Sequence, residues 1–99
     1  MSASLSGHVL VVDDEPGLRE FLEICLSRAG HKVETASSGA EAIRMVEARN
    51  AREAADDKPP YDVVLTDLTM PGVNGMELLR HCVGLDPAPT VLMMTAYGT

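Results

Sequence analysis

Short apolar runs recur along the chain and predict the strands of a sheet. Residues 8–14 (HVLVVDD), 61–67 (YDVVLTD) and 90–95 (TVLMMT) are nearly continuous in apolar residues. Runs of this length and composition are typical of strands that are buried on both faces of a parallel sheet. Residues 31–36 (HKVETA) alternate between polar and apolar positions, and this weaker pattern predicts a fourth strand, as at an edge of the sheet.

Helical spacing of apolar residues predicts three helices between these strands: one over residues 16–29, one from about residue 38, and one over residues 75–83. The first begins with Pro16, a residue that suits the first turn of a helix. The alanine-rich residues 47–60 contain charges of both signs, and we expect them to form an exposed extension of the second helix, stopped by the prolines at its end.

Two pairs of residues mark where the second and third helices start. Ser38 with Glu41, and Asn74 with Glu77, have the spacing of a capping box. The element order is therefore β-α-β-α-β-α-β, and each connection is long enough to hold a helix, so the strands should be parallel with right-handed crossovers. We predict a doubly wound α/β sheet, a fold that binds ligands beyond the carboxyl ends of its strands.

The last apolar run predicts a further feature of the sheet. Residues 90–95 have the composition of a central strand, yet only four residues follow them. If the third strand lies on one side of this run, its other side is an uncovered apolar edge, which natural proteins avoid. We therefore expect residues 1–99 to form a single domain that is truncated after its fourth strand. The uncovered edge gives an alternative function, self-association through edge pairing or exchange of elements.

Composition and charge narrow the class of protein. The 99 residues have a net charge of −7, with 15 acidic and 8 basic residues, which argues against binding to nucleic acid or to an anionic membrane by this segment. No apolar run approaches the ~20 residues that span a bilayer, and the first residues lack the pattern of a signal peptide.

Cys25 and Cys82 have no metal-site spacing, so we expect them to be buried small hydrophobes. A cytoplasmic protein is the expectation.

Polar residues end three of the predicted strands. Asp13 and Asp14 follow the first, Asp67 ends the third, and Thr95 ends the fourth. Neighbouring parallel strands lie ~4.8 Å apart and end at the same edge, so the side chains can converge. Two carboxylates ~5 Å apart repel each other by about 3 kcal/mol at an effective dielectric near 20. A divalent cation offsets that repulsion, and oxygen ligands suit Mg²⁺ or Mn²⁺.

Each of these residues also has an ordinary structural interpretation. Asp13 and Asp14 could cap the first helix, Asp67 could form a turn, and Thr95 is unremarkable at the end of a strand. The combination favours a shared pocket, because independent caps and turns need not all fall at the carboxyl ends of strands. The glycines and proline of residues 71–75 then let the following loop fold back beside Asp67.

Three stretches together carry a resemblance to a known family. Residues 9–16 (VLVVDDEP), 62–79 (DVVLTDLTMPGVNGMELL) and 91–98 (VLMMTAYG) resemble, in order and spacing, the receiver domain of two-component response regulators. The resemblance implies a flavodoxin-like fold with strand order 2-1-3-4-5. It also implies that Asp67 accepts a phosphoryl group from the phosphohistidine of a sensor histidine kinase. A receiver is a phosphoacceptor rather than a conventional enzyme, although it can catalyse its own phosphorylation and dephosphorylation.

The same resemblance implies roles for the residues around Asp67. Asp13 and Asp14 would bind Mg²⁺, one directly and the other through water, together with Asp67. The backbone carbonyl of Thr69 would be a further metal ligand. Thr95 would be the switch hydroxyl that hydrogen-bonds the phosphoryl oxygen, with help from the backbone amide of Ala96.

The chain also departs from the family pattern. Receivers continue through a fourth helix, a fifth strand and a fifth helix, and a lysine at the end of the fifth strand contacts the phosphoryl group. Neither Lys32 nor Lys58 lies where it can replace that lysine. We therefore expect a sheet of order 2-1-3-4, slow or absent phosphotransfer and impaired signalling.

The final residues resemble a particular class of response regulator. Residues 95–99 (TAYGT) resemble the receivers of nitrogen-regulatory-class transcription activators, whose output domains are an ATPase and a DNA-binding domain.

A third interpretation is an Mg²⁺-dependent phosphatase that forms an aspartyl phosphate. Such enzymes usually carry a second acid two residues after the nucleophile, where this chain has Thr69.

Overall fold

Strands and helices alternate along the chain. The computed structural model describes residues 7–51 and 60–94, and the structural statements below concern these residues. Four strands and three helices follow one another in the predicted order: β1 (His8–Val12), α1 (Pro16–Arg28), β2 (Lys32–Ala36), α2 (Gly39–Ala51), β3 (Val63–Asp67), α3 (Gly75–Val83) and β4 (Thr90–Met94).

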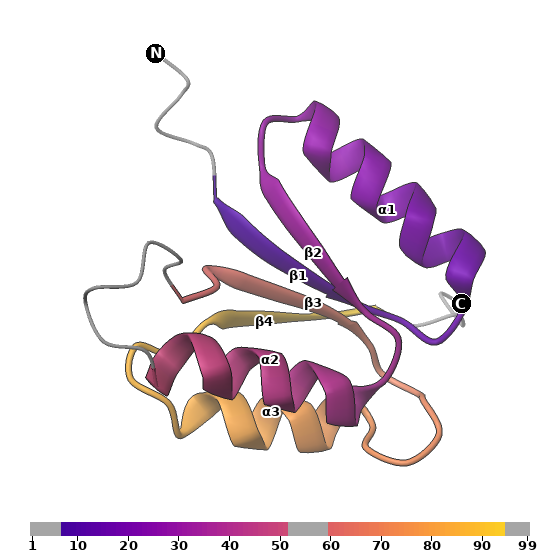
Figure 1. The fold of residues 1–99 in the computed structure, drawn as a ribbon. Helices are drawn as coiled ribbons and strands as arrows, with labels where there is room; N and C mark the ends of the chain where they lie inside the picture. Colours follow the sequence, from indigo (N-terminus) through magenta and orange to yellow (C-terminus); the bar gives the residue numbers. More distant parts are fainter. Residues whose placement is uncertain (1–6, 52–59, 95–99) are drawn as a thin grey trace.

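The strands form one parallel sheet of order β2-β1-β3-β4 (Figure 1). This confirms the predicted doubly wound fold and the edge position of the weakly patterned strand β2. In the register of the sheet, Val12 at the end of β1 lies beside Ala36 and Thr66, and Asp67 at the end of β3 lies beside Met94. The carboxyl ends of the strands therefore meet along one edge of the sheet.

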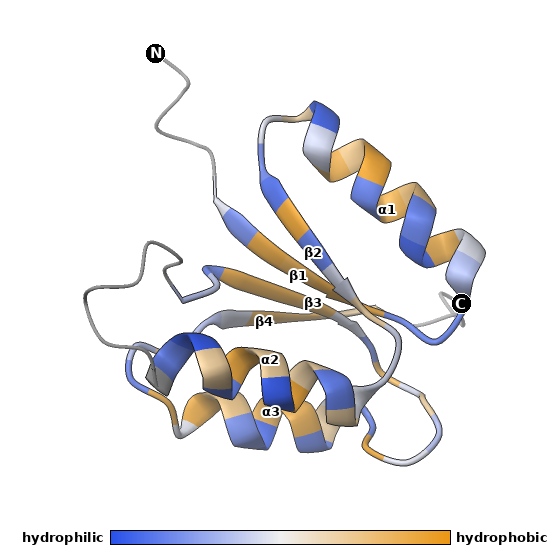
Figure 2. Cartoon of the chain, in the orientation of Figure 1, coloured by the Kyte–Doolittle hydropathy of each residue, from blue (hydrophilic) through white to orange (hydrophobic). Residues whose placement is uncertain are grey.

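Helices cover both faces of the sheet. Helix α1 lies on one face, and α2 and α3 lie side by side on the other (Figure 1). The apolar strands run between them as a continuous layer (Figure 2), and Leu10, Val11 and Val12 of β1 have no exposed surface. Burial on both faces explains why the sequence of this strand is a continuous apolar run. The main core cluster contains Leu10, Val12, Ala36, Ala42, Val46, Tyr61, Val64, Met70, Leu78 and Cys82.

Helix α1 is more exposed than its apolar spacing suggests. No residue of α1 is fully buried, and Phe21, one of the apolar residues at helical spacing, is 61% exposed. Among the described residues α1 is the one helix on its face of the sheet, so only the side chains that face β1 and β2 are covered. The prediction that both cysteines are buried is wrong for Cys25, which is exposed, and confirmed for Cys82. Burial raises the pKa of the Cys82 thiol.

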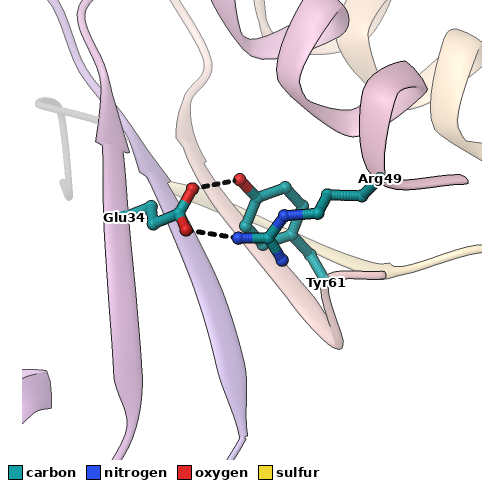
Figure 3. A network of polar contacts seen from close by, with 3 residues as sticks. All are labelled: Glu34, Arg49 and Tyr61. Atoms are coloured by element: carbon teal, nitrogen blue, oxygen red, sulfur yellow. Dashed lines mark hydrogen bonds and ion pairs between the residues drawn. The ribbon is translucent and has the colours of Figure 1, made fainter. Parts of the chain in front are cut away.

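The end of α2 holds a polar network that the sequence pattern did not predict. Helix α2 continues to Ala51, which includes the first residues of the predicted extension, while residues 52–59 of that extension lie outside the described residues. Arg49 within α2 is only 8% exposed. Its guanidinium pairs with the Oε2 atom of Glu34 on β2, and its Cζ atom lies 4.2 Å from the centre of the Tyr61 ring (Figure 3). The Tyr61 hydroxyl donates a 2.6 Å hydrogen bond to Oε1 of Glu34. The network thus ties β2, α2 and the start of β3 together.

The Tyr61 hydroxyl gives a first prediction about stability. Burial, and then the hydrogen bond to Glu34 and its charge, raise the pKa of Tyr61, so the hydroxyl remains a donor at neutral pH. Tyr61→Phe keeps the ring under Arg49 but removes the hydrogen bond. We expect a loss of about 1.5–3 kcal/mol in the free energy of unfolding, because hydrogen bonds to charged groups contribute about that much. Urea denaturation measures it, and a variant as stable as wild type would contradict the role of this bond.

Candidate functional site

Three carboxylates meet where β1 and β3 end. Asp13 and Asp14 follow β1, and Asp67 is the last residue of β3. One oxygen from each carboxylate lies within 4.8 Å of the other two. The parallel register of β1 and β3 produces this arrangement, because both strands end at the same edge. The structure therefore brings together the three acidic residues that the sequence analysis singled out.

Asp13 is held firmly and is almost completely buried. Its backbone N–H donates to the carbonyl of Ala36 at 3.2 Å, and its own carbonyl accepts from the Arg19 guanidinium at 2.7 Å. Its Oδ1 atom accepts from the backbone N–H of Glu15 at 2.8 Å. The residue is 1% exposed, and its Oδ2 atom is buried without a hydrogen-bond partner among the described residues. A buried carboxylate oxygen without a partner is costly, and it needs a cation or a proton.

The surroundings of Asp13 favour its neutral form. Burial has the largest effect and raises the pKa of this carboxyl, while the hydrogen bond from the Glu15 backbone lowers it in part. The negative charges of Asp67, Asp14 and Glu15 raise the pKa further. Without a cation, the carboxylates of the pocket therefore repel one another, and burial makes the charged form of Asp13 unfavourable.

Helix α1 begins without using either of the two aspartates as its cap. The N-cap is Glu15, whose carboxylate accepts a 2.7 Å hydrogen bond from the backbone N–H of Leu18. The interpretation of Asp13 and Asp14 as helix caps is therefore wrong. The Oδ1 atom of Asp13 has a local role in accepting from the N–H of Glu15, but its Oδ2 atom has no such role, and the exposed Asp14 faces solvent at the rim of the cluster.

Asp67 combines a turn-forming role with a place in the cluster. Its Oδ1 atom accepts a 3.2 Å hydrogen bond from the backbone N–H of Thr69, as in the turn-forming interpretation. Beyond it, the backbone N–H of Leu68 donates to the carbonyl of Met94 at 2.9 Å, so the strand pairing continues past the end of β3. Asp67 is half-buried, which leaves the carboxylate both oriented and accessible.

The loop after Asp67 folds back as its glycines predict. Gly72 has a φ of +74°, in the left-handed region that favours glycine. At Gly75 a Cβ atom would lie 2.6 Å from the carbonyl oxygen of Asp67, so this position accepts glycine alone without rearrangement. The predicted capping box then starts α3, with Asn74 and Glu77 exchanging hydrogen bonds of 3.1 and 3.0 Å.

These residues fit a hard divalent cation. The three carboxylates supply oxygen ligands, and the partnerless Oδ2 atom of Asp13 supplies a buried one that no described residue satisfies. Mg²⁺ and Mn²⁺ prefer such oxygen-only sites and usually retain several waters. Thr69 follows Asp67 by two residues in an exposed part of the loop, and its carbonyl is a further oxygen that could serve. Thr95 and Ala96, the predicted partners of the phosphoryl group, lie outside the described residues.

Comparison with known proteins identifies relatives across most of the chain. The pattern that defines the response regulator receiver domain matches residues 9–99. The response regulator protein PilR of Pseudomonas aeruginosa is 39% identical over 92 residues, which cover 91% of this chain and 18% of PilR. The transcriptional regulatory protein GlrR of Escherichia coli is 35% identical over 93% of this chain and 18% of its own length. The chain thus spans about a fifth of these curated relatives, which support the resemblance of residues 95–99 to nitrogen-regulatory-class activators.

A solved structure supports the same relationship. The response regulator protein TrrA of Thermotoga maritima, determined in a complex with Mg²⁺ and BeF, superposes with a TM-score of 0.77 at 32% identity. The superposition covers 93% of this chain and 71% of TrrA.

Of the helices that the structure describes in the present chain, none has the length and apolar character needed to cross a membrane.

Proposed function

Because the chain belongs to the response regulator receiver domain family of two-component signalling, we propose that Asp67 is its phosphoacceptor, with a histidine kinase as donor. Receivers of this family are phosphoacceptors that interact with histidine kinases and with output domains. We further propose that residues 1–99 act as one receiver unit. The observation that carries the assignment is the convergence of Asp67 with Asp13 and Asp14, in which one buried oxygen of Asp13 has no partner among the described residues.

Exposure distinguishes Asp67 from its two neighbours as the phosphoacceptor. Asp13 is 1% exposed and already accepts a hydrogen bond at Oδ1, so a phosphoryl group cannot reach it without displacing the core. Asp14 is exposed and has no described residue orienting it. Asp67 is half-buried and is held by the N–H of Thr69. A nucleophile needs both access and a fixed orientation, and Asp67 alone of the three has both.

The proposed transfer is a displacement at phosphorus. An oxygen of Asp67 forms a bond to phosphorus while the bond from phosphorus to the donor imidazole nitrogen breaks. The imidazole keeps the electron pair of that bond and takes a proton from solvent. Mg²⁺, held by Asp13, Asp14, Asp67 and the Thr69 carbonyl, would neutralise charge on the carboxylates and on the phosphoryl oxygens. In this proposal the Thr95 hydroxyl and the Ala96 amide hydrogen-bond the transferred group.

Chemical phosphorylation tests the proposal without the kinase. Because the family lysine is missing, acetyl phosphate with Mg²⁺ should add one phosphoryl group to the wild-type chain only slowly, as read by intact mass after long incubation, and chelation of the metal should prevent the addition. An Mg²⁺-dependent phosphatase is the weaker alternative, because Thr69 stands where a second acid would be needed. Sustained release of phosphate from a small phosphoester would favour the phosphatase.

Strand β4 supports self-association as a second candidate function. Within the described residues β4 pairs only with β3, and Leu92 on it is 51% exposed. An apolar strand edge is a template for pairing with another chain. We expect the molar mass from light scattering to rise with concentration, and Leu92→Lys to reduce the rise. A monomer throughout a wide concentration range would contradict this candidate.

A further inference from the structure

The first residue of α2 lies against the loop that follows Asp67. Gly39 is buried, and a Cβ atom placed on it would overlap the carbonyl oxygen of Val73. The same atom would lie 2.8 Å from both Cβ and Cγ1 of Val73. Separations this short are essentially never seen for real Cβ atoms. The φ of Gly39 is not positive, so glycine is required here by close approach and not by backbone conformation.

The start of α2 is a fixed surface for this contact. The Ser38 hydroxyl accepts from the N–H of Glu41 at 3.1 Å, and the Glu41 carboxylate accepts from the N–H of Ser37 at 2.8 Å. One turn further on, Ala42 and Val46 are completely buried in the core. A close-packed core does not let the helix retreat freely. An added methyl group at Gly39 must therefore displace the loop or the helix start, and the loop has fewer constraints.

The loop over residues 68–74 is held at its two ends and at Met70. The N–H of Gly75 donates to the Leu68 carbonyl at 3.1 Å, which closes the base of the loop. Met70 is buried in the core and Gly72 is exposed. The contact of Val73 with Gly39 adds a support from α2. The distance between the start of α2 and the loop therefore helps to set where the loop stands beside Asp67.

We propose that Gly39 is a positioning residue for the phosphoacceptor site. It lets α2 approach the backbone of Val73, and that approach holds the loop with Thr69 in place beside Asp67. The inference rests on the proposed function, in which the Thr69 carbonyl and the Asp67 carboxylate hold Mg²⁺. Because Mg²⁺ demands near-octahedral geometry, a displaced carbonyl weakens binding even when the carboxylates are untouched.

The test compares two glycine-to-alanine variants of the 99-residue chain. Gly39→Ala introduces the overlap with Val73. Gly84→Ala is the matched control, because its Cβ atom would meet nothing nearer than the His81 carbonyl oxygen at 3.7 Å. We expect Gly39→Ala to bind Mg²⁺ about tenfold more weakly than wild type, in the range of supporting residues around metal sites. In the metal-free protein its amide resonances at Asp67 and Thr69 should shift, while Gly84→Ala should match wild type in both measurements.

The outcomes separate this inference from the proposed function. If wild type binds Mg²⁺ and Gly39→Ala folds and binds it equally well, the role of Gly39 is overturned and the proposed function stands. A wild type that binds no Mg²⁺ overturns both. If Gly39→Ala does not fold, Val73→Ala replaces it, with the exposed Val83→Ala as control. Val73→Ala should weaken Mg²⁺ binding about threefold, less than the roughly 10–100-fold effect of residues that hold metal ligands directly, and unchanged binding would overturn the inference.

Discussion

Asp13→Asn is expected to stabilise the metal-free protein at neutral pH and to abolish its binding of Mg²⁺. The asparagine Oδ1 atom can still accept from the N–H of Glu15, as Asp13 does at 2.8 Å. Its amide nitrogen replaces the partnerless oxygen with a donor that faces the carboxylates of Asp14 and Asp67. One charge pair ~5 Å apart costs about 3 kcal/mol at an effective dielectric of 20, so a gain of about 1–2 kcal/mol is reasonable after solvent screening at Asp14.

The pH dependence of stability follows from the direction of the Asp13 shift. The pKa of Asp13 is raised in the folded state, chiefly by burial, so the folded protein binds a proton more tightly than the unfolded chain does. As pH falls through the folded pKa toward the unfolded value of about 3.9, this residue makes the protein more stable. Above the folded pKa the same residue destabilises the protein. Asp13→Asn removes this contribution, and the difference in stability between wild type and variant should shrink as pH falls.

Urea denaturation in chelator and in Mg²⁺ measures both effects. In chelator at pH 7 the variant should be the more stable protein. Saturating Mg²⁺ should stabilise wild type by RT ln(1 + [Mg²⁺]/Kd) and leave the variant unchanged. Asp62→Asn is the control, since Asp62 lies just before β3 at the opposite end of the strand from Asp67. An Asp13→Asn protein that is less stable in chelator, or that Mg²⁺ still stabilises, would contradict the account of the pocket.

Asp67→Asn is expected to eliminate phosphoryl uptake from acetyl phosphate. An amide oxygen is a poor nucleophile toward phosphorus and cannot form the acyl phosphate. The variant keeps an oxygen able to accept from the N–H of Thr69, which Asp67 does at 3.2 Å, so the loop should remain in place. The expected loss is complete within the detection of intact mass, while Asp62→Asn should be modified as wild type is. Equal modification of Asp67→Asn and wild type would remove the assignment of this residue.

The sheet could be predicted because strands that are buried on both faces are continuous apolar runs in the sequence. The run at β1 is apolar at consecutive positions and its central residues have no exposed surface. The capping pair Asn74 and Glu77 marks the start of α3 because both hydrogen bonds of a capping box are local. The cluster of Asp13, Asp14 and Asp67 followed from topology alone, since parallel strands end at a common edge.

Contacts between distant segments could not be predicted in the same way. Arg49 looked like part of an exposed helix, and only the fold reveals that Glu34 and Tyr61 lie beside it. The aspartates were an alternative for the cap of α1, because aspartate is a common N-cap residue, yet the longer side chain of Glu15 fills that position. The exposure of Phe21 could not be predicted, because apolar spacing identifies a helix but does not show how much of that helix the rest of the fold covers.

Gly39 is the site residue that sequence reasoning missed, although a signal was present. The capping pair Ser38 and Glu41 places Gly39 in the first turn of α2. Glycine inside a helix costs roughly 0.5–1 kcal/mol relative to alanine. That cost applies to the middle of a helix, and Gly39 is the first residue of α2, so the glycine alone is a weak signal of close approach. Only the structure shows that Val73 lies against it.

Mapping the modified residue tests the central claim most directly. The wild-type chain is treated with acetyl phosphate, with Mg²⁺ or with chelator, and the acyl phosphate is trapped by reduction and located by fragment-ion mass spectrometry. The account predicts one modification, on Asp67, that requires Mg²⁺. Modification of Asp13, Asp14 or another carboxylate in place of Asp67, or modification that persists in chelator, would contradict it.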